Sequence, residues 1–341
     1  MRVAVFTGPG KPIAIECVAD PQPGRDELLV KICRCGICGS DVSMTSEGPF
    51  SYPIGCRLGH EYSGEVVEVG RDVTAMKVGD RVACLPILGC GKCDGCRGGN
   101  AIFCTAIKSL SGGFGEYISV PPRAAVLLPQ SLSLADGALI EPMACGLHAL
   151  RMAGMRGGER ILVLGAGTMA LSIVYWARVL GAGKIVALSR SAHRRDIVLA
   201  MGADAVHAFD TDDPKSLAEA LGGLPDIVAE CIGKQGQLNN AIDHVRPQGT
   251  VIAMGMCSQG EPIVAARCTF KEVRMLFPLG YTVGEFAETA NAFDSGRVRP
   301  ELMVSDVIPL EDLPATLEKL RAGAKSLKIH VDPSLSGPGR G

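Results

Sequence analysis

Residues 161–177 read ILVLGAGTMALSIVYWA, an uncharged and mostly apolar run. A membrane-spanning helix needs roughly 20 apolar residues, so the run is short for that role. Gly165 and Gly167 also interrupt it where a turn is expected. A strand that ends at these glycines and is followed by a helix explains the pattern better. The run therefore predicts a buried strand, a tight turn and a buried helix, and no membrane span.

The turn has the form G-x-G-x-x-A. In this pattern the first glycine makes the turn, the second lets a pyrophosphate approach the backbone, and the small third residue lets the helix pack on the strand. A strand before the motif and a helix after it are the context it requires. The free N–H groups at the start of the helix also favour an anion. We therefore predict that a dinucleotide binds here, at Gly165, Gly167, Thr168, Met169 and Ala170.

The alternation of strands and helices continues on both sides of this motif from about Gly157. Short apolar strands are expected at 161–164, 184–188, 226–229 and 250–255, with helices between them, for example at 191–201 and 237–245. Strands that alternate with helices indicate a parallel sheet with crossover helices. This part of the chain is therefore expected to be an α/β dinucleotide-binding domain.

The end of the second strand bears on the choice of cofactor. About twenty residues after the glycine motif, an NAD enzyme places Asp or Glu against the ribose 2′-hydroxyl. Here the strand ends in Ser189 and Arg190, and Arg194 follows. A guanidinium in place of a carboxylate favours the 2′-phosphate of NADP. The alternative is that these arginines lie on a solvated helix face and that NAD is used.

The first 130 or so residues have a different pattern. Leu28, Val30 and Ile32 alternate with other residues, and stretches 63–70, 80–84 and 116–120 are rich in β-forming residues. Frequent Gly and Pro separate these short strands, which is typical of an all-β, barrel-like domain.

Four cysteines in this half have the spacing C-x2-C-x2-C-x7-C: Cys90, Cys93, Cys96 and Cys104. Four thiolates brought together by short Gly-rich turns suit a closed, tetrahedral structural zinc site. The bacterial iron–sulfur run has a shorter last gap followed by Pro, whereas Thr105 follows here. Free thiols in a flexible loop are the remaining alternative. We expect a zinc that holds the loop and does not react.

A second candidate metal set is spread along the chain: Cys38 in GICGSD, His60 in GHE and Glu141 in IEP. Each residue alone is more often a packed core residue than a ligand. Together they offer three protein ligands and leave one position of a zinc ion open to water or substrate. An open position is what Lewis-acid chemistry requires.

Composition restricts the function classes. The net charge is −2, charged residues make up 21% and aromatic residues 4%, so neither a basic footprint nor a stacking platform for nucleic acid is expected. The fourteen cysteines gather mainly between Cys33 and Cys104, and the N-terminus has no secretion-signal pattern. Thiolates kept reduced for metal binding predict a soluble, cytoplasmic protein.

Taken together and in order, GICGSD, GHE, the four-cysteine lobe, IEPMACGLHA, VLGAGTMA and ECIG resemble the zinc-containing medium-chain dehydrogenases, within them the sorbitol, threonine and butanediol dehydrogenase branch. The resemblance implies an α/β Rossmann dinucleotide-binding domain over 149–280 and a mostly β, GroES-like catalytic domain. The catalytic domain would comprise 1–148, with the structural zinc lobe at about 88–106, and 281–341, with a disordered C-terminal tail.

The resemblance also assigns roles to residues around the open metal site. It implies that Cys38 and His60 bind a catalytic zinc and that Glu141 is the acidic third ligand. Glu61 would be an alternate or water-mediated ligand, and Cys145, four residues after Glu141, stays open as a further candidate. Asp41 matches the carboxylate that orients the zinc-bound imidazole, and Ser40 matches the hydroxyl that takes the proton from the alcohol. These matches follow from the residues at the corresponding motif positions.

One residue departs from the pattern. Related enzymes often carry a His five residues after the cysteine ligand, at the end of the proton relay, where this chain has Ser43. Either Ser43, a cofactor ribose hydroxyl or water completes the path, or the pH dependence differs. His148, in the same resembling stretch as Glu141, is interpreted as a packing residue.

The substrate pocket is expected between the domains, over the catalytic zinc, with Phe50 and Phe114 as candidate lining residues. No cluster of charged residues indicates a phosphate or carboxylate on the substrate. We therefore expect a secondary alcohol, diol or polyol and its ketone, exchanged with NADP(H). The resemblance implies a homodimer or homotetramer.

Two other functions compete with this interpretation. A zinc-free quinone or enoyl reductase would lack the cysteine lobe and the Cys–His pair. A non-catalytic zinc protein that binds NADP(H) as a redox sensor is the second alternative. Retention of Ser40 and Asp41 beside the ligands argues for chemistry.

Overall fold

The computed structural model describes residues 1–190, 192–209, 214–295 and 299–336. The chain forms two compact units. The first comprises 1–141, 282–294 and 304–341, and the second comprises 142–281 and 295–303. The division near residue 141 lies within helix α3 (Leu134–Met152), seven residues before the boundary expected at 148. Of the tail expected at 333–341, residues 337–341 lie outside the described part.

Six strands of the described chain form the parallel sheet of the second unit. Their spatial order is β12-β11-β10-β13-β14-β15, so the chain first builds the sheet in one direction from β10 and then returns to extend it in the other. This is the order of a doubly wound dinucleotide-binding fold. The strands are β10 (Arg160–Leu164), β11 (Lys184–Ser189), β12 (Ala205–Ala208), β13 (Ile227–Glu230), β14 (Thr250–Ala253) and β15 (Arg274–Leu276).

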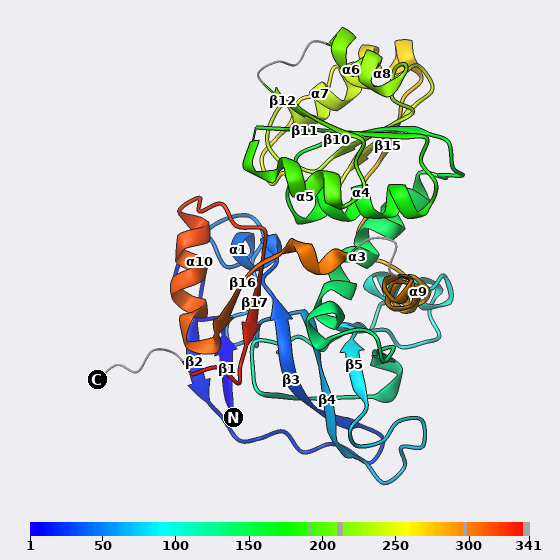
Figure 1. Ribbon diagram of the computed structural model, residues 1–341. Coiled ribbons are helices and arrows are strands. Elements are labelled where there is room, and N and C mark those ends of the chain that lie inside the picture. Colours follow the sequence, from blue (N-terminus) through cyan, green and yellow to red (C-terminus); the bar gives the residue numbers. More distant parts are fainter. Residues whose placement is uncertain (191, 210–213, 296–298, 337–341) are drawn as a thin grey trace. The chain divides into compact units, whose positions relative to one another are not determined.

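Helices cover both faces of this sheet. Figure 1 shows α4 and α5 on one face and α6, α7 and α8 on the other. They are α4 (Thr168–Val179), α5 (Arg195–Ala200), α6 (Pro214–Leu221), α7 (Gln237–His244) and α8 (Ala265–Lys271). The helix expected at 191–201 forms as a 3-10 turn, η3 (Ala192–Arg194), and then α5; its first residue, Ser191, lies outside the described residues.

The run at 161–177 forms the strand, turn and helix that its pattern predicts. Ile161 to Leu164 are fully buried in β10, because both faces of a parallel sheet are covered. In α4, Trp176 donates its indole N–H to the carbonyl of Met143 at 2.7 Å. The Ser172 hydroxyl reaches the same carbonyl at 3.2 Å. The Trp176 indole and the Ser172 hydroxyl therefore both have a partner in α3.

The first unit is built on a mixed sheet, in which β16 and β17 pair in parallel and the other neighbouring strands pair antiparallel. In the described chain its larger sheet has the order β16-β17-β3-β4-β5-β9, and β8 also pairs with β3. These strands are β3 (Leu28–Gly36), β4 (Glu61–Val69), β5 (Arg81–Cys84), β8 (Tyr117–Val120), β9 (Ala125–Leu127), β16 (Val304–Pro309) and β17 (Lys328–Asp332). Strands expected at 28–32, 63–70, 80–84 and 116–120 are confirmed within a few residues. Because β17 pairs with β3, His330 and Val331 lie beside Gly36 and Cys35.

Shorter elements complete the first unit. They are β1 (Arg2–Val5), β2 (Ala14–Cys17), α1 (Gly39–Ser43), β6 (Ile87–Leu88), α2 (Asp94–Arg97), η1 (Ala101–Phe103), β7 (Lys108–Ser109), η2 (Pro122–Ala124), α9 (Val283–Asp294), η6 (Leu310–Asp312) and α10 (Leu313–Arg321). The second unit also contains η5 (Pro300–Met303).

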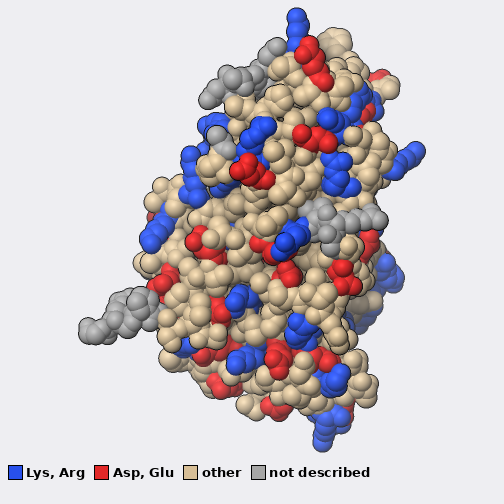
Figure 2. Space-filling view, viewed as in Figure 1, with Lys and Arg blue, Asp and Glu red and all other residues tan. Residues whose placement is uncertain are grey.

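Figure 2 shows basic and acidic side chains interspersed on the face in view, without a broad basic patch there. Within the part of the chain that the structure describes, no helix has both the length and the apolarity needed to cross a membrane.

Candidate active site

The glycine motif of the second unit lies at the carboxyl end of the central strand β10. Gly165 has φ +114°, a backbone conformation that residues with a Cβ rarely adopt. Gly167 is the extended residue that precedes α4, and a Cβ placed on it would meet no atom within 4 Å. The turn is therefore tight at its first glycine and open at its second. A pyrophosphate fits this arrangement, because it can approach the backbone at Gly167 and the free N–H groups of Thr168 and Met169.

The residues expected to select the cofactor lie beside this motif. Ser189 ends β11 and is buried, whereas Arg190 is exposed. Arg194 donates from Nη1 to the carbonyl of Ala166, inside the glycine motif, at 3.1 Å. Burial lowers the pKa of the Arg194 guanidinium, and an arginine side chain keeps its charge in proteins. A fixed cation therefore lies next to the turn that would hold the phosphates.

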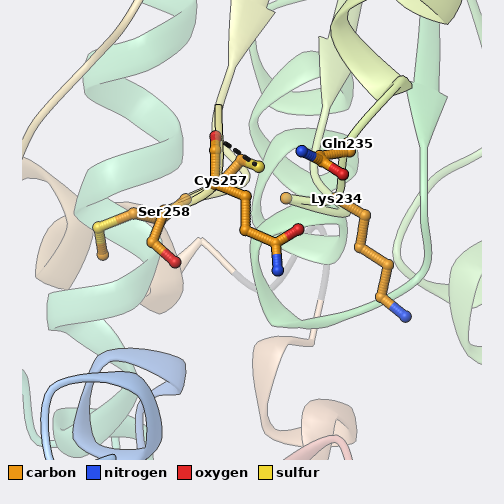
Figure 3. A pocket seen from close by; sticks show the side chains of 7 residues that line it. Lys234, Gln235, Cys257 and Ser258 are labelled. Atoms are coloured by element: carbon orange, nitrogen blue, oxygen red, sulfur yellow. Dashed lines mark hydrogen bonds between the residues drawn. The ribbon is translucent and has the colours of Figure 1, made fainter. Parts of the chain in front are cut away.

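A cavity of about 440 Å³ opens at the same edge of the sheet. It is lined by the loop after β13 and the loop after β14: Gly233, Lys234, Gln235, Met256, Cys257, Ser258 and Gln259. Figure 3 shows Lys234 and Gln235 on one side and Cys257 and Ser258 on the other. In open α/β sheets, ligands bind at the carboxyl ends of the strands where the strand order reverses. The cavity lies at the carboxyl ends of β13 and β14, and β13 is the strand that borders the reversal on one side.

Buried hydrogen bonds hold these loops in place. The Glu230 carboxylate accepts N–H bonds from Ile232 at 2.6 Å and Gly233 at 2.9 Å. Burial raises the pKa of Glu230, although the two backbone bonds oppose that rise. Gln235 donates from Nε2 to the Gly260 carbonyl at 2.6 Å, which joins the two loops that line the cavity.

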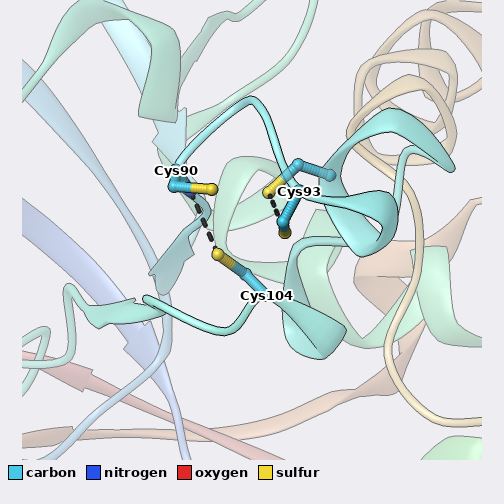
Figure 4. Close-up of side chains that lie close together, drawn as sticks. Cys90, Cys93 and Cys104 are labelled. Atoms are coloured by element: carbon cyan, nitrogen blue, oxygen red, sulfur yellow. Dashed lines mark hydrogen bonds between the residues drawn. The ribbon is translucent and has the colours of Figure 1, made fainter.

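The four cysteines of the first unit converge. The sulfur atoms of Cys90, Cys93, Cys96 and Cys104 all lie within 4.8 Å of one another. The sulfurs of Cys93 and Cys96 are 3.6 Å apart. Figure 4 shows the side chains of Cys90, Cys93 and Cys104 close together. Four sulfurs at 2.3 Å from one tetrahedral Zn²⁺ would be about 3.8 Å apart. The cluster therefore fits a zinc ion closed in by four thiolates.

The backbone around the lobe favours thiolates. Cys90 and Ala106 direct their N–H groups at the Cys104 sulfur, at 3.1 and 3.3 Å. Backbone hydrogen bonds from Cys96 and Thr105 lower the pKa of Cys93 to about 6. Deprotonated sulfur is the form that binds a metal, so these contacts prepare the lobe for one.

A second cluster lies between α1 and β4 in the same unit. The ligand atoms of Cys38, His60 and Glu61 lie within 4.8 Å of one another. Cys38 precedes α1, and His60 precedes β4, of which Glu61 is the first residue. A soft thiolate, an imidazole and a carboxylate form a donor set that suits Zn²⁺. Cys38 is about twenty positions away from His60 and Glu61 in the sequence. The pairing of β3 with β4 brings the three residues together.

Asp41 contacts both Cys38 and His60 in this cluster. One carboxylate oxygen accepts the Cys38 backbone N–H at 2.9 Å, and the other lies 3.4 Å from Nδ1 of His60. Burial alone would lower the pKa of His60, but the charges of Asp41 and Cys38 outweigh it and raise that pKa well above its usual value. With Nδ1 directed at Asp41, Nε2 lies 3.5 Å from the Ser40 hydroxyl. The imidazole therefore presents Nε2 to the side of the thiolate and Ser40.

Glu61 has a partner that the sequence analysis did not include. Lys328 on β17 donates to both carboxylate oxygens, at 2.7 and 2.5 Å, and to the Ile37 carbonyl at 2.9 Å. Glu61 is 0% exposed and Lys328 is 2% exposed. A Cβ on Gly36 would lie 2.1 Å from a Glu61 oxygen, so glycine is required there. The only signal in the sequence was a lysine at the start of a β-like apolar segment.

Glu141 and Cys145 both lie on α3, but on different sides of the division between the units. Glu141 belongs to the first unit, and its charge is one of those that raise the pKa of Lys328 against the opposing effect of burial. It is not part of the 4.8 Å group around Cys38 in the described chain. Cys145 and His148 belong to the second unit.

The two candidate pocket residues have different surroundings. Phe114 is fully buried, and a Cβ on Gly59 would lie 2.4 Å from its backbone nitrogen. It therefore supports the backbone that leads into His60. Phe50 is 62% exposed in the loop that follows α1. Tyr52, two residues later, was not among the expected residues, and its ring packs edge-on against Phe6, with centroids 6.4 Å apart.

Comparisons with known proteins cover nearly the whole chain. The family model for the alcohol dehydrogenase GroES-like domain matches residues 24–130, and the model for the zinc-binding dehydrogenase domain matches residues 165–295. The chain is 32% identical over 306 residues to L-galactonate-5-dehydrogenase of Escherichia coli K12, with 88% of this chain and 89% of the relative covered. It is 31% identical over 353 residues to sorbitol dehydrogenase of Bacillus subtilis 168, with 98% of both covered.

Solved structures agree with these matches. A Sinorhizobium meliloti 1021 structure, assigned to the zinc-binding dehydrogenases and bound to NADP, has a TM-score of 0.89 and 31% identity, with 97% of this chain and 99% of that one covered. The 2R,3R-butanediol dehydrogenase of Bacillus subtilis has a TM-score of 0.87 and 29% identity, with 98% and 99% covered.

Proposed function

Because the chain belongs to the zinc-binding dehydrogenases that carry an alcohol dehydrogenase GroES-like domain, we propose that it oxidises a secondary alcohol, diol or polyol to the ketone with NADP as hydride acceptor. The alcohol carbon gives a hydride to the nicotinamide, and the hydroxyl proton passes to solvent. The observation that carries this proposal is the convergence of Cys38, His60 and a carboxylate beside the Ser40 hydroxyl.

Cys38 and His60 would hold a catalytic zinc, and Cys90, Cys93, Cys96 and Cys104 a structural one. A zinc ion with an open position supplies Lewis-acid polarisation of the alcohol oxygen. Asp41 holds the His60 ring through Nδ1 and so keeps Nε2 available. Ser40 lies 3.5 Å from that nitrogen and would receive the proton that the alcohol loses.

Glu141 is the carboxylate that we favour as the third ligand. Glu61 lies closer to Cys38 and His60, but Lys328 already donates to both of its oxygens. If the buried Glu61 carboxylate turned to a metal ion, the buried Lys328 ammonium would lose its partner. A buried charge without a partner is strongly destabilising. We therefore assign Glu61 the role of alternate ligand. Cys145 stays a second candidate for the third position.

The cofactor is proposed to be NADP, held at Gly165, Gly167, Thr168, Met169 and Ala170. Ser189 offers no carboxylate to repel a 2′-phosphate, and Arg190 and Arg194 supply positive charge nearby. The NADP in the structure from Sinorhizobium meliloti supports this choice. The cavity at Lys234 and Cys257 would receive part of the same cofactor.

The substrate class follows from the relatives. The names of the sorbitol dehydrogenase, the D-xylulose reductases and the 2R,3R-butanediol dehydrogenase all indicate hydroxyl-rich or vicinal alcohols. Of the two pocket candidates, Phe50 has the exposed ring that contact with a substrate needs. Phe114 is fully buried and would support the backbone under the pocket. All described cysteines are free, which suits a reducing compartment, and we propose the cytoplasm.

We also propose a homodimer or homotetramer. β15 is an edge strand of the parallel sheet, and Phe270, Phe277 and Leu279 on and around it are 88%, 62% and 52% exposed. An open edge strand with apolar neighbours can pair with the same edge of a second copy about a two-fold axis.

The direct test is a substrate screen with the purified protein. Sorbitol, D-arabinitol, 2R,3R-butanediol and L-galactonate would be oxidised with NADP or NAD, and D-xylulose reduced with NADPH or NADH, with absorbance of the reduced cofactor as the signal. We expect turnover of at least one pair, greater kcat/KM with NADP(H), and loss of activity after chelation. Metal analysis should find about two zinc ions per chain if both sites fill. Tight NADPH binding without turnover of any substrate would favour the redox-sensor alternative.

A further inference from the structure

Helix α1 carries two residues that are proposed to act at the metal site, Ser40 and Asp41, yet it is only five residues long. Isolated helices shorter than about 12–15 residues are marginal in water, so contacts from other parts of the chain must hold α1 in its geometry. The carbonyls at the end of a helix show where such contacts lie, because they lack partners within the helix. At the end of α1, the backbone carbonyl of Asp41 accepts a hydrogen bond from the hydroxyl of Thr45.

Thr45 follows α1 and is fully buried. Its hydroxyl donates its hydrogen to the Asp41 carbonyl, with the Val42 carbonyl further away at 3.4 Å. The lone pairs of the hydroxyl oxygen then remain to accept a bond. Arg321 donates to that oxygen from Nη2 at 2.5 Å, and the same nitrogen lies 3.3 Å from the Thr45 carbonyl. Because a guanidinium only donates, the chain of bonds has one direction, from Arg321 through Thr45 to the Asp41 backbone.

Arg321 is itself held by its own helix. It lies in the last turn of α10, where Nη1 pairs with the Glu318 carboxylate. Leu313 and Leu317 of the same helix are 0% exposed and anchor it in the first unit. The Arg321 side chain is 13% exposed, so water competes little for its hydrogen bonds. Arg321 therefore offers a fixed donor to the end of α1.

The Asp41 side chain connects this chain of bonds to the metal cluster. Its buried carboxylate accepts the Cys38 N–H at 2.9 Å and lies 3.4 Å from Nδ1 of His60. Because the aspartate side chain is short, a shift of its backbone moves the carboxylate relative to the imidazole. The partner of the second ring nitrogen fixes the orientation of a histidine that binds a metal. The position of the Asp41 backbone therefore bears on the orientation of the His60 ring.

We propose that Arg321 and Thr45 are positioning residues, which fix the Asp41 backbone and thereby hold its carboxylate against His60. Neither is a catalytic residue, because both act through Asp41. The inference rests on the proposed function, in which the His60 ring has to present Nε2 to the metal. A helix near the carboxyl end of the chain thus sets the geometry of α1, since Arg321 reaches Thr45 from 276 positions further along the chain.

The effect on the ring can be measured without any substrate. The protein contains six histidines, so [¹³Cε1]histidine labelling should give six resonances, of which His60→Asn identifies one. Thr45→Val and Arg321→Met should each shift the His60 resonance. Ser46→Ala is the matched control, since the Ser46 hydroxyl donates to the Val42 carbonyl at 2.7 Å, and it should leave the resonance in place. A His60 resonance that stays in place in Thr45→Val or in Arg321→Met would refute the proposal, whatever the enzyme's substrate is.

A conservative variant separates positioning from packing. Thr45→Val keeps the shape of the buried side chain and removes its hydroxyl, whereas Thr45→Ser keeps the hydroxyl and removes the methyl group. If Thr45 acts through its hydroxyl, Thr45→Ser should retain the His60 resonance and the kcat of the wild type, and Thr45→Val should retain neither. The opposite pattern would show that Thr45 only fills space and would overturn the proposal.

Kinetics test the consequence for catalysis, with the alcohol or ketone of the screen that gives the greatest kcat/KM as the probe. Changing a direct partner of a metal ligand typically costs about 10–100-fold, and these two residues lie one contact further away. Thr45→Val and Arg321→Met should therefore lower kcat about fivefold, with KM changed less than about twofold. Lys319→Met, which removes an exposed cation from the same helix as Arg321, is the control and should change neither constant. An unchanged kcat in Arg321→Met would contradict the proposal.

A double-mutant cycle shows whether the two residues act through one chain of bonds. The double variant Thr45→Val with Arg321→Met should lower kcat no further than either single variant. A loss equal to the product of the two single losses would show that the residues act independently and would overturn the proposal. If the wild-type chain turns over no substrate, the proposed function fails, and the His60 resonance still decides whether Arg321 and Thr45 hold the ring.

Discussion

At the scale of single residues, the ion pair between Lys328 and Glu61 limits the ability of Glu61 to bind a metal. Its ammonium is almost fully buried, and it donates to two Glu61 oxygens and to the Ile37 carbonyl. Removing one partner of a buried ion pair typically costs about 3–5 kcal/mol, because the other charge is left uncompensated. Glu61 is therefore held as a carboxylate next to the cluster, although its pairing with Lys328 competes with metal binding.

Cofactor preference also belongs to this scale, because two side chains are expected to decide it. Ser189→Asp with Arg190→Ala introduces a carboxylate that repels a 2′-phosphate and removes a cation that attracts it. We expect the ratio of kcat/KM for NADP to that for NAD to fall by at least about tenfold, equivalent to about 1.4 kcal/mol. Steady-state kinetics with both cofactors measure it. Arg195→Ala is the control, since Arg195 donates to the Val206 carbonyl at 2.7 Å. A ratio that barely changes would contradict the NADP assignment.

At the scale of elements, the two metal clusters differ in how they are built. The lobe at 90–104 gathers its four sulfurs within one short segment, through α2 and η1. The Cys38 cluster instead uses one residue before α1 and two at the start of β4, placed by strand pairing. The first has four thiolates and no open position, and the second has fewer ligands with a hydroxyl beside them. Closed sites serve structure and open sites serve chemistry.

This difference predicts opposite outcomes for two cysteine substitutions. Cys38→Ser should lose one zinc ion and activity while the thermal unfolding temperature stays close to that of the wild type. Cys96→Ser should lose the other zinc ion and lower that temperature by several degrees, because structural zinc contributes folding free energy. Metal analysis and calorimetry on both variants check this. Equal thermal stability of the two variants would argue against a structural role for the lobe.

At the scale of the whole molecule, each unit has its own sheet, and the chain passes from one to the other within α3. The first unit is completed by residues 304–341, which add β16 and β17 beside β3. Lys328 therefore reaches Glu61 from a strand 267 positions further along the chain. The proposed active site of the first unit depends in this way on the carboxyl-terminal segment.

Assembly is the prediction that belongs to this scale. If the β15 edge pairs with a second copy, Phe277→Lys should shift the protein from dimer or tetramer towards a smaller species, since a buried lysine without a partner is unfavourable. Light scattering after size-exclusion chromatography measures the mass. Val78→Lys, at an exposed site of the first unit, is the control. A monomeric wild type would contradict the proposed oligomer, and an unchanged assembly in Phe277→Lys would contradict the proposed edge.

The amino-acid sequence by itself determined the features that depend on short spacing. The turn at Gly165 and Gly167, the alternation of strands and helices from β10 onward, and the four-cysteine lobe each arise within a few residues or from a regular period, and the structure has all three. The resemblance to the zinc-containing medium-chain dehydrogenases and the two expected fold classes are confirmed by the family models and the solved structures.

Only the tertiary structure decided which distant residues meet. Lys328 and Glu61 are 267 positions apart, and their pairing depends on β17 joining β3 next to β4. The loop that contains Tyr52 is tied to the end of α1 at Met44 and to β1 and its continuation at Phe6 by backbone hydrogen bonds. The reason is physical: strand order and loop closure are set by burial and pairing over the whole chain, and no local pattern of residue types records them.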